Sequence, residues 1–421
     1  MDFEPWWLIV LPVLFGLGWM AARFDFRQIL SESRNLPDSY FKGLNFLLNE
    51  QPDRAIDAFV EVAKLDSETT ELHFALGSLF RRRGEIERAI RVHQSLLARA
   101  DLPIKDRETA QYELAQDFLK AGLLDRAEEA FEAVVETRFA MDAMRALIRI
   151  YESEHDWPKA IEAVRRLRAY VEEPVPQLVH YQCEQAQAAL EQREPNLQRA
   201  AEALAEADAA ANALGEKGGS AASRARIYIL KAKLAQLQND LTGQRDYLTE
   251  VLRIAPQYGG LIANDLMNCY KQLNEAAQGL SALKSCYEAN PSVDVFNVVF
   301  RELREQQGHV RAWTFARSAL RSNPLLLSLD RMLEVELTFA DNRSAVPLTG
   351  APIEALPASA AVDVVAGADL GLLRRLVHKH THRLDRYSCR ECGFEAQHYY
   401  WQCPGCNSWE TYAPKRLEEL Q

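Results

Sequence analysis

The hydrophobic positions of the chain follow three patterns, and the first is an uncharged run close to the N-terminus. From Pro5 to Ala22 eighteen consecutive residues carry no charge. A helix of that length spans about 27 Å, close to the hydrocarbon thickness of a bilayer, which is about 30 Å. Tryptophans lie near both ends of the run, where amphipathic rings favour the headgroup level. The pattern predicts a transmembrane anchor within residues 1–24.

The charges on either side of this run predict its orientation. Asp2 and Glu4 precede it, whereas Arg23, Arg27 and Arg34 follow it. Because positive residues stay on the cytoplasmic side, we expect the N-terminus outside and the remainder of the chain in the cytoplasm. A cleaved signal peptide is one alternative, but signal peptides begin with positive charge. A buried soluble helix is the other, and an uninterrupted terminal run disfavours it.

The second pattern is a helical period that returns at intervals of 34 residues. Gly43 and Gly77 are 34 residues apart, and so are Ala55 and Ala89. The stretch LHFALGSLFRRRGEIERAIRVHQSLL, residues 72–97, reads as two helices joined by a turn. This arrangement resembles the tetratricopeptide repeat, in which small residues lie where paired helices approach closely.

Later units keep the same period less regularly. Prolines that cannot extend a helix follow at Pro256, Pro291 and Pro324, at spacings of 35 and 33 residues. We predict about eight repeats within residues 36–342. One helix pair cannot bury its apolar face alone, so stacked pairs share a core and wind into a superhelical solenoid with an extended concave surface. An irregular helical bundle is the alternative.

Residues 343–368 interrupt the helical period with three prolines and many small residues, which predicts a linker. Residues 369–385 then include LGLLRRLVHKHTHR, which predicts an amphipathic helix. We expect this helix to dock with a polar outer face, and attraction of its cations to anionic headgroups or nucleic acid is the alternative. Its alternating histidines cannot share one helical face, so we do not expect them to bind a metal.

The third pattern is a cysteine cluster within residues 386–415, in YSCRECGFEAQHYYWQCPGCNSWETY. Its two C-x-x-C pairs consist of Cys389, Cys392, Cys403 and Cys406. Each pair forms a turn that presents two thiolates to one ion, and we expect a hairpin between the pairs to bring them together. The nearby aromatic residues that we expect to cover the sulfurs are Tyr399, Tyr400, Trp401 and Trp409.

Four thiolates suit one iron ion or one zinc ion. So small a module has little core, so the metal would contribute much of its folding free energy. The order C-x-x-C-G and then C-P-x-C resembles rubredoxin, although the shorter intervening stretch is closer to zinc ribbons. A redox dithiol is the alternative, but paired motifs at this spacing fit a ligand set better.

The composition of the chain excludes some classes of function. The chain carries 60 acidic and 49 basic residues, a net charge of −11, which argues against a nucleic-acid partner over the whole surface. A cluster of four free cysteines favours a reducing compartment, in agreement with the cytoplasmic orientation. The glycine-rich stretch GEKGGS lacks the spacing of a phosphate-binding loop, and we expect no enzymatic activity. The fold class is therefore all-α, with an anchor before the solenoid and a β knuckle after it.

Three blocks, FLLN, LGSLFRRRGEIERAIRVHQ and CGF…YWQCPGC, together with the anchor resemble the lipopolysaccharide assembly protein B family over nearly the whole chain. The resemblance implies a single-pass protein of the cell inner membrane, with a periplasmic N-terminus, that restrains lipopolysaccharide synthesis. It implies three kinds of partner: a membrane-anchored AAA protease, the deacetylase that commits precursor to lipid A, and other lipopolysaccharide-assembly membrane proteins. It also implies rubredoxin-type iron at the four cysteines.

Two features depart from the family pattern: an Ala-rich segment at 200–214 and a longer Pro-rich linker. Two other functions stay open. One is a nucleic-acid-binding repeat protein with a zinc ribbon, and the other is an exported envelope-assembly repeat protein, which requires signal cleavage.

Overall fold

The computed structural model describes most of the chain between residues 51 and 420. The described ranges are 51–65, 70–171, 175–215, 220–344 and 367–420, with residues 15, 19, 42–43, 45–46 and 49. The predicted anchor, except for Phe15 and Trp19, and most of the predicted linker lie outside these residues. Within the described residues no helix is both long enough and apolar enough to cross a bilayer. The chain forms two compact units, residues 1–150 and 151–421.

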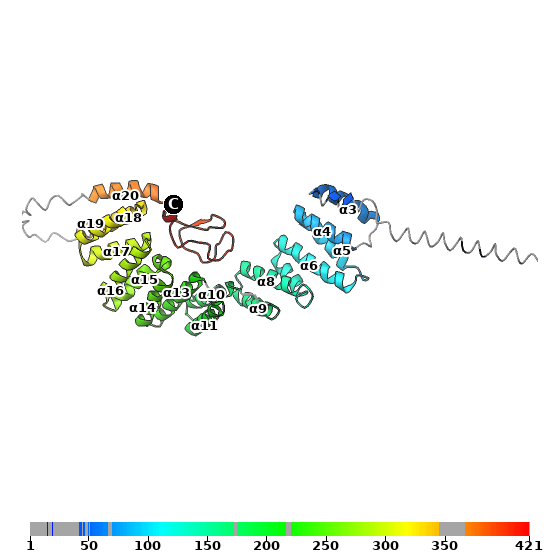
Figure 1. The fold of residues 1–421 in the computed structure, drawn as a ribbon, viewed down its shortest axis with the longest axis horizontal. Coiled ribbons are helices and arrows are strands. Elements are labelled where there is room, and N and C mark those ends of the chain that lie inside the picture. The colour runs from blue at the N-terminus through cyan, green and yellow to red at the C-terminus, as the bar shows by residue number, and fades with distance from the viewer. Residues whose placement is uncertain are drawn as a thin grey trace, which may run out of the picture. The chain divides into compact units, whose positions relative to one another are not determined.

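The first unit consists of helices that pack in antiparallel pairs (Figure 1). They are α3 (Pro52–Leu65), α4 (Thr70–Arg83), α5 (Ile86–Leu97), α6 (Ile104–Lys120), α7 (Leu124–Glu132) and most of α8 (Ala140–Glu154). Phe59, Leu76 and Ala89 are buried in the core that α3, α4 and α5 share. Gly77 explains the close approach of α4 and α5, because a Cβ at this position would collide with the imidazole of His93.

The second unit continues the pairs and ends in the cysteine segment. Its helices are α9 (Trp157–Arg168), α10 (Gln177–Leu190), α11 (Leu197–Ala213), α13 (Ala221–Leu237), α14 (Leu241–Ile254), η1 (Pro256–Tyr258), α15 (Gly259–Gln272), α16 (Ala276–Ala289), α17 (Val293–Gln306), α18 (His309–Ser322), α19 (Leu326–Ser344), α20 (Gly367–Thr381) and η3 (Leu417–Leu420). A two-stranded antiparallel sheet, β1 (Tyr387–Ser388) and β2 (Glu395–Ala396), lies between α20 and η3. The predicted helical solenoid with a small C-terminal knuckle is confirmed.

The turn inside most helix pairs uses one residue with a left-handed backbone. These residues are Gly84, Gly122, His155, Asn239, Asn274 and Gly308. Glycine, asparagine and histidine tolerate this conformation better than β-branched residues do. In five of these turns the next amide donates to a carbonyl of the preceding helix, as Glu85 N does to Phe80 O. The turn therefore keeps its geometry where the sequence period is degenerate.

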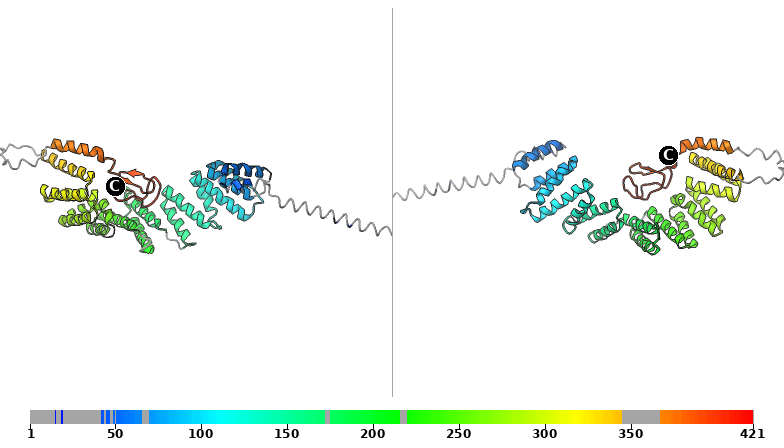
Figure 2. Two further views of the ribbon diagram at one scale, coloured as in Figure 1. Left: turned by 45° about the horizontal axis from the view of Figure 1, so that its top comes forward. Right: turned by 180° about the vertical axis from the view of Figure 1, so that it is seen from behind.

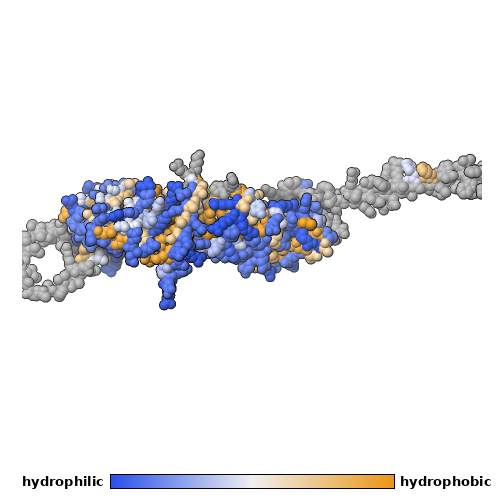
Figure 3. All heavy atoms as spheres, turned by 90° about the horizontal axis from the view of Figure 1, so that it is seen from below, coloured by the Kyte–Doolittle hydropathy of each residue, from blue (hydrophilic) through white to orange (hydrophobic). Residues whose placement is uncertain are grey.

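The core of the second unit is continuous from α13 to α19. Small and aromatic side chains alternate in it, among them the buried Ala263, Phe296 and Phe300. Gly279 lets α16 approach α15 closely, because a Cβ there would lie 2.7 Å from the side chain of Tyr270. On the face of the molecule shown in Figure 3 hydrophilic residues dominate and hydrophobic residues lie between them.

Helix α20 packs on α19, as expected of a docking helix, but its outer face is polar only in part. Arg374 and His378 point to carboxylates on α19, whereas Leu372, Leu373 and Leu376 are about half exposed. The reason is that α19 offers Asp330 and Glu334 at this contact, so Arg374 and His378 face α19, while the leucines and the remaining cations of α20 stay outside.

The cysteine segment, residues 386–415 and called the knuckle below, lies against the helices of the second unit. Figures 1 and 2 show it from three directions beside the stack of α10 to α19. Its contacts fall mainly on α10, α13, α15 and α17, which are the first helices of successive pairs. We call the surface that these helices present the docking face.

Candidate metal centre

The four predicted cysteines come together at the tip of the knuckle. All four sulfur atoms lie within 4.8 Å of one another. Cys389 Sγ and Cys406 Sγ are 3.8 Å apart, and Cys392 Sγ and Cys403 Sγ are 3.6 Å apart. A tetrahedron with metal–sulfur bonds of about 2.3 Å has edges of about 3.8 Å, whereas a disulfide bond is about 2.05 Å long. The sulfurs are therefore spaced for one central zinc or iron ion.

The two C-x-x-C pairs have nearly the same backbone. Cys389 O accepts from Gly393 N at 3.0 Å, and Cys403 O accepts from Asn407 N at 2.8 Å. The residue after each pair has a left-handed backbone, with φ of 72° at Gly393 and 57° at Asn407. Each turn thus aims two sulfurs at the same point. Gly393 is the glycine of the C-x-x-C-G motif, whereas the equivalent role of Asn407 was not predicted.

The protonation behaviour of the four thiols is also consistent with a bound cation. Desolvation raises the pKa of Cys389, but hydrogen bonds with Thr411 and with backbone amides outweigh it and lower the pKa to about 6. Hydrogen bonds with the side chain and backbone of Ser408 lower the pKa of Cys406. At Cys392 a hydrogen bond with the Phe394 backbone favours the thiolate, yet desolvation and the neighbouring sulfurs raise the pKa to about 12. Four thiolates at these distances need a positive ion between them.

The expected single hairpin between the pairs is absent from the described knuckle. Instead β1 and β2 flank the first pair, and an antiparallel bridge between Gln402 and Trp409 flanks the second. Each pair therefore has its own short hairpin, because each C-x-x-C turn reverses the chain by itself. Within the described residues the four cysteines form the one group of three or more ligands close enough to share an ion.

Of the aromatic residues expected to cover the sulfurs, some pack against the cysteines and others pack against the helices. Tyr399 packs against the cysteine cluster together with Tyr387 and Tyr412, of which the last two were not anticipated. Trp401 and Trp409 face the helices instead. Trp401 stacks on Tyr258 with ring centroids 5.3 Å apart.

Trp409 fills a pocket of aromatic residues on the docking face. Its ring lies parallel to the imidazole of His180, with centroids 4.7 Å apart, and edge-on to Trp157 at 5.9 Å. Its indole Nε1 donates to Glu152 at 2.5 Å. Arg226, almost fully buried, lies 5.6 Å from the ring centroids of both knuckle tryptophans. The knuckle is therefore held by stacking and cation–π contacts.

Glu410, the next residue, makes the main polar contact between the knuckle and the docking face. Its Oε1 accepts from His180 Nε2 at 2.8 Å, from Ser220 Oγ at 2.5 Å and from Ser223 Oγ at 2.6 Å. Ser220 is the N-cap of α13, so the carboxylate also lies at the positive end of that helix. Desolvation raises the pKa of Glu410, but these hydrogen bonds outweigh it and lower the pKa to about 2.

His180 is a neutral hydrogen-bond donor in this cluster. Burial lowers its pKa, although the hydrogen bond to Glu410 opposes the shift. Arg226 Nη1 lies 3.3 Å from His180 Nδ1 and can only donate, so Nδ1 accepts and Nε2 carries the proton. The contact with Glu410 is then a neutral–ionic hydrogen bond rather than an ion pair. Arg226 also pairs with Glu184, so its charge is compensated.

The residues after the knuckle complete the attachment. Arg416 forms an ion pair with Asp294 at 3.0 Å. Glu419 accepts from Val293 N at 3.0 Å, and Glu418 accepts from the amides of Leu326 and Leu327. These carboxylates cap the N-termini of α17 and α19, where unpaired amides and the helix dipole favour negative charge.

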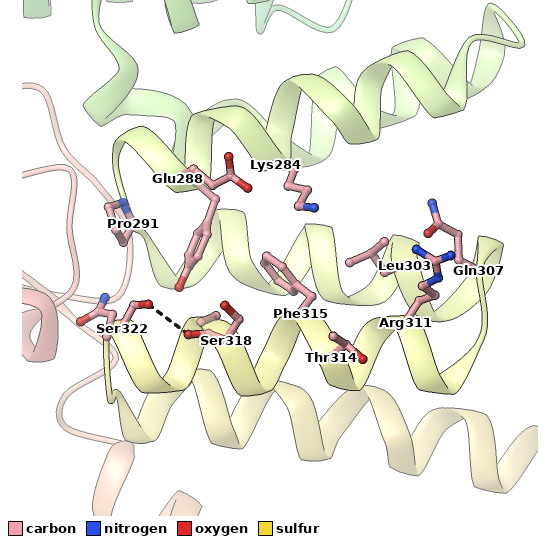
Figure 4. A pocket seen from close by; sticks show the side chains of 13 residues that line it. Lys284, Glu288, Pro291, Leu303, Gln307, Arg311, Thr314, Phe315, Ser318 and Ser322 are labelled. Carbon is pink, nitrogen blue, oxygen red and sulfur yellow. Dashed lines mark hydrogen bonds between the residues drawn. The ribbon is translucent and has the colours of Figure 1, made fainter.

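A separate cavity of about 450 Å³ lies between α16, α17 and α18 (Figure 4). Phe315 and Leu303 form its apolar part, and Lys284, Glu288 and Arg311 carry its charges. Thr314, Ser318 and Ser322 add hydroxyl groups, so the lining is mixed in character.

Comparison with known proteins identifies both parts of the chain. Residues 42–101 and 112–174 match the tetratricopeptide repeat model, and residues 387–414 match the model described as the rubredoxin metal binding domain. A tetratricopeptide-repeat protein structure from Cytophaga hutchinsonii is 12% identical and covers 60% of this chain and 95% of that chain, with a TM-score of 0.38.

Two full-length relatives carry the same name. Lipopolysaccharide assembly protein B of Escherichia coli is 30% identical over 417 residues, 97% of each chain. The protein of that name from Haemophilus influenzae is 26% identical over 422 residues, 98% of each chain. At this identity and coverage, the chain belongs to the lipopolysaccharide assembly protein B family.

Proposed function

We propose that this chain is a non-enzymatic adaptor in lipopolysaccharide assembly, held at the cell inner membrane by its N-terminal segment. In this role it brings the deacetylase that commits precursor to lipid A to a membrane-anchored AAA protease, and so promotes turnover of the deacetylase. The observation that carries the proposal is the match along nearly the whole chain to relatives named lipopolysaccharide assembly protein B. The solenoid fits an adaptor because stacked helix pairs offer extended binding surfaces.

The knuckle supports this role as a structural part of the adaptor. Cys389, Cys392, Cys403 and Cys406 would hold one iron or zinc ion, which would compensate the thiolate charges and join the two hairpins. The knuckle then presents Trp401, Trp409 and Glu410 to the docking face as one rigid body. Because these residues cover part of that face, partners have the remaining helix surfaces available, including the cavity between α16 and α18.

The anchor would make modest affinities sufficient. Two partners confined to one membrane surface meet at a high effective concentration, so an adaptor tethered there need not bind either of them tightly. A chain without residues 1–22 should therefore fold its helix pairs and yet promote turnover poorly.

Depletion of the protein tests the proposal directly. We expect the half-life of the deacetylase to lengthen and the ratio of lipopolysaccharide to phospholipid to rise. The intact chain should restore both, and the chain without residues 1–22 should restore neither fully. An unchanged half-life on depletion would contradict the adaptor role. Binding of nucleic acid by the purified chain, or a processed N-terminus with a periplasmic chain, would favour one of the two other functions instead.

A further inference from the structure

Helix α20 packs with its polar side inward. Arg374 Nη2 donates to Glu334 Oε1 on α19 at 2.6 Å, and His378 Nδ1 lies 3.2 Å from Asp330 Oδ2. Thr381, one turn further, is only 1% exposed. Residues three or four apart lie on one side of a helix, so these three side chains define the side of α20 that faces α19.

The leucines of α20 lie on the other side. Leu372, Leu373 and Leu376 are 52%, 48% and 56% exposed. Single exposed leucines are common on protein surfaces, but three neighbours on one helix face form a patch. The exposure of the patch does not result from a loosely placed helix, because ion pairs and a hydrogen bond hold the opposite side of α20 against α19. The described residues do not bury these leucines, so their burial would require a binding partner or a lipid surface.

Positive charge accompanies the leucines. From Gly371 to Leu384 the chain carries four Lys or Arg residues and no carboxylate, although its net charge is −11. Arg375, Lys379 and Arg383 are exposed, and the side chain of Arg383 is 79% exposed. Its one described ion-pair partner is Glu395, at 3.6 Å.

We propose that the outer face of α20 lies on an anionic phospholipid surface. Leucines flanked by exposed lysine and arginine are the chemistry by which a helix rests in the headgroup region, with its apolar side among the acyl chains and its cations at the phosphates. A nucleic acid would use the cations but gain nothing from the leucines. An acidic protein helix could use both, and the experiment below separates it from lipid. The proposal does not depend on the adaptor role.

The face would act as a second membrane contact in addition to the predicted anchor. One amphipathic helix with three half-exposed leucines binds weakly by itself, but a tethered chain needs only weak affinity. Each cation near an anionic surface contributes about fivefold in affinity. Removing three of them should therefore weaken the contact about 100-fold.

Photo-crosslinking in the full-length protein tests the contact locally, so a membrane anchor elsewhere in the chain does not affect the result. The photoreactive residue p-benzoylphenylalanine replaces Leu376, and in the matched control it replaces Val310, which is 77% exposed on α18. Both proteins are reconstituted in phosphatidylcholine vesicles with and without phosphatidylglycerol, and lipid adducts are counted by mass spectrometry. Circular dichroism verifies that the helix content is unchanged.

We expect lipid adducts at position 376 to exceed those at 310 at least tenfold. The reason is that three cations, each contributing about fivefold in affinity, hold the face around position 376 at the lipid, and none of them lies on α18, which carries position 310. They should fall to the control level without phosphatidylglycerol and in the variant Arg375→Gln, Lys379→Gln, Arg383→Gln. Equal yields at the two positions would overturn the proposal. So would an adduct of two protein chains, which would identify a second copy as the occupant, or a protein adduct in native membranes in place of lipid.

Discussion

Replacing Glu410 with glutamine should weaken the docking of the knuckle without changing its shape. The lowered pKa of Glu410, from 4.5 to about 2, corresponds to about 3 kcal/mol of stabilisation at pH 7. A quarter of the side chain reaches solvent, which weakens the interaction, and glutamine can still accept some of the hydrogen bonds. We therefore expect Glu410→Gln to cost about 2 kcal/mol, or about 30-fold in the docking equilibrium.

Urea titration with tryptophan emission measures this loss, because Trp401 and Trp409 leave their aromatic partners when the knuckle detaches. Far-UV circular dichroism follows the helix pairs separately, and their transition should not move. Glu391→Gln is the matched control, an exposed carboxylate on the same knuckle. If Glu410→Gln and the wild type detach at the same urea concentration, the carboxylate does not hold the knuckle.

The pH dependence has a defined sign. A carboxylate whose pKa is lower in the folded state stabilises that state fully above its unfolded pKa, near 4.5, and loses the effect as the pH falls toward about 2. The advantage of the wild type over Glu410→Gln should therefore be constant above pH 5 and shrink below it, within about that window. Thiol protonation affects both proteins equally, so the difference between them isolates Glu410. A constant difference down to low pH would contradict the assignment.

Three further changes have separate expected outcomes. Cys392→Ser should release the metal and unfold the knuckle while the helix pairs keep their helicity, as metal analysis and circular dichroism would measure. Gly77→Ala should lower the free energy of unfolding by about 1–3 kcal/mol, because its Cβ meets His93. Gly371→Ala, where no atom lies within 4 Å, should not lower the thermal stability and serves as its control, because alanine favours a helix more than glycine does. A C-terminal reporter active only in the cytoplasm should work, and activity of a periplasmic reporter instead would contradict the predicted orientation.

The features that could be predicted are those that depend on residues close together in the sequence. Gly77 and Ala89 repeat the positions of Gly43 and Ala55 because close helix packing requires small residues at fixed places in every pair. The sulfur cluster was equally accessible, since each C-x-x-C turn fixes its own two sulfurs and only one ion can join the pairs.

The attachment of the knuckle could not be predicted in the same way. Glu410 contacts Ser223, which lies 187 positions earlier, and His180, which lies 230 positions earlier, and no spacing in the sequence connects them. Trp409 was assigned to the sulfurs because they are near in the sequence, whereas its partners are on distant helices. The exposed leucines of α20 were missed for a related reason: Arg374 and His378 face inward because α19 supplies carboxylates, and a helical period alone does not show which side faces inward.

The distance along the chain between the docking face and the knuckle has a consequence for synthesis. Ser223 leaves the ribosome 187 residues before Glu410, which corresponds to about 10–40 s at ordinary translation rates. During that interval α10 and α13 can fold, yet His180 and Arg226 have no cover. The amides at the starts of α17 and α19 wait for Glu419, 126 residues later, and for Glu418, 92 residues later. A nascent chain therefore exposes aromatic and charged groups that the finished one buries, and a chain interrupted before the knuckle keeps them exposed, which makes it a substrate for chaperones and quality-control proteases.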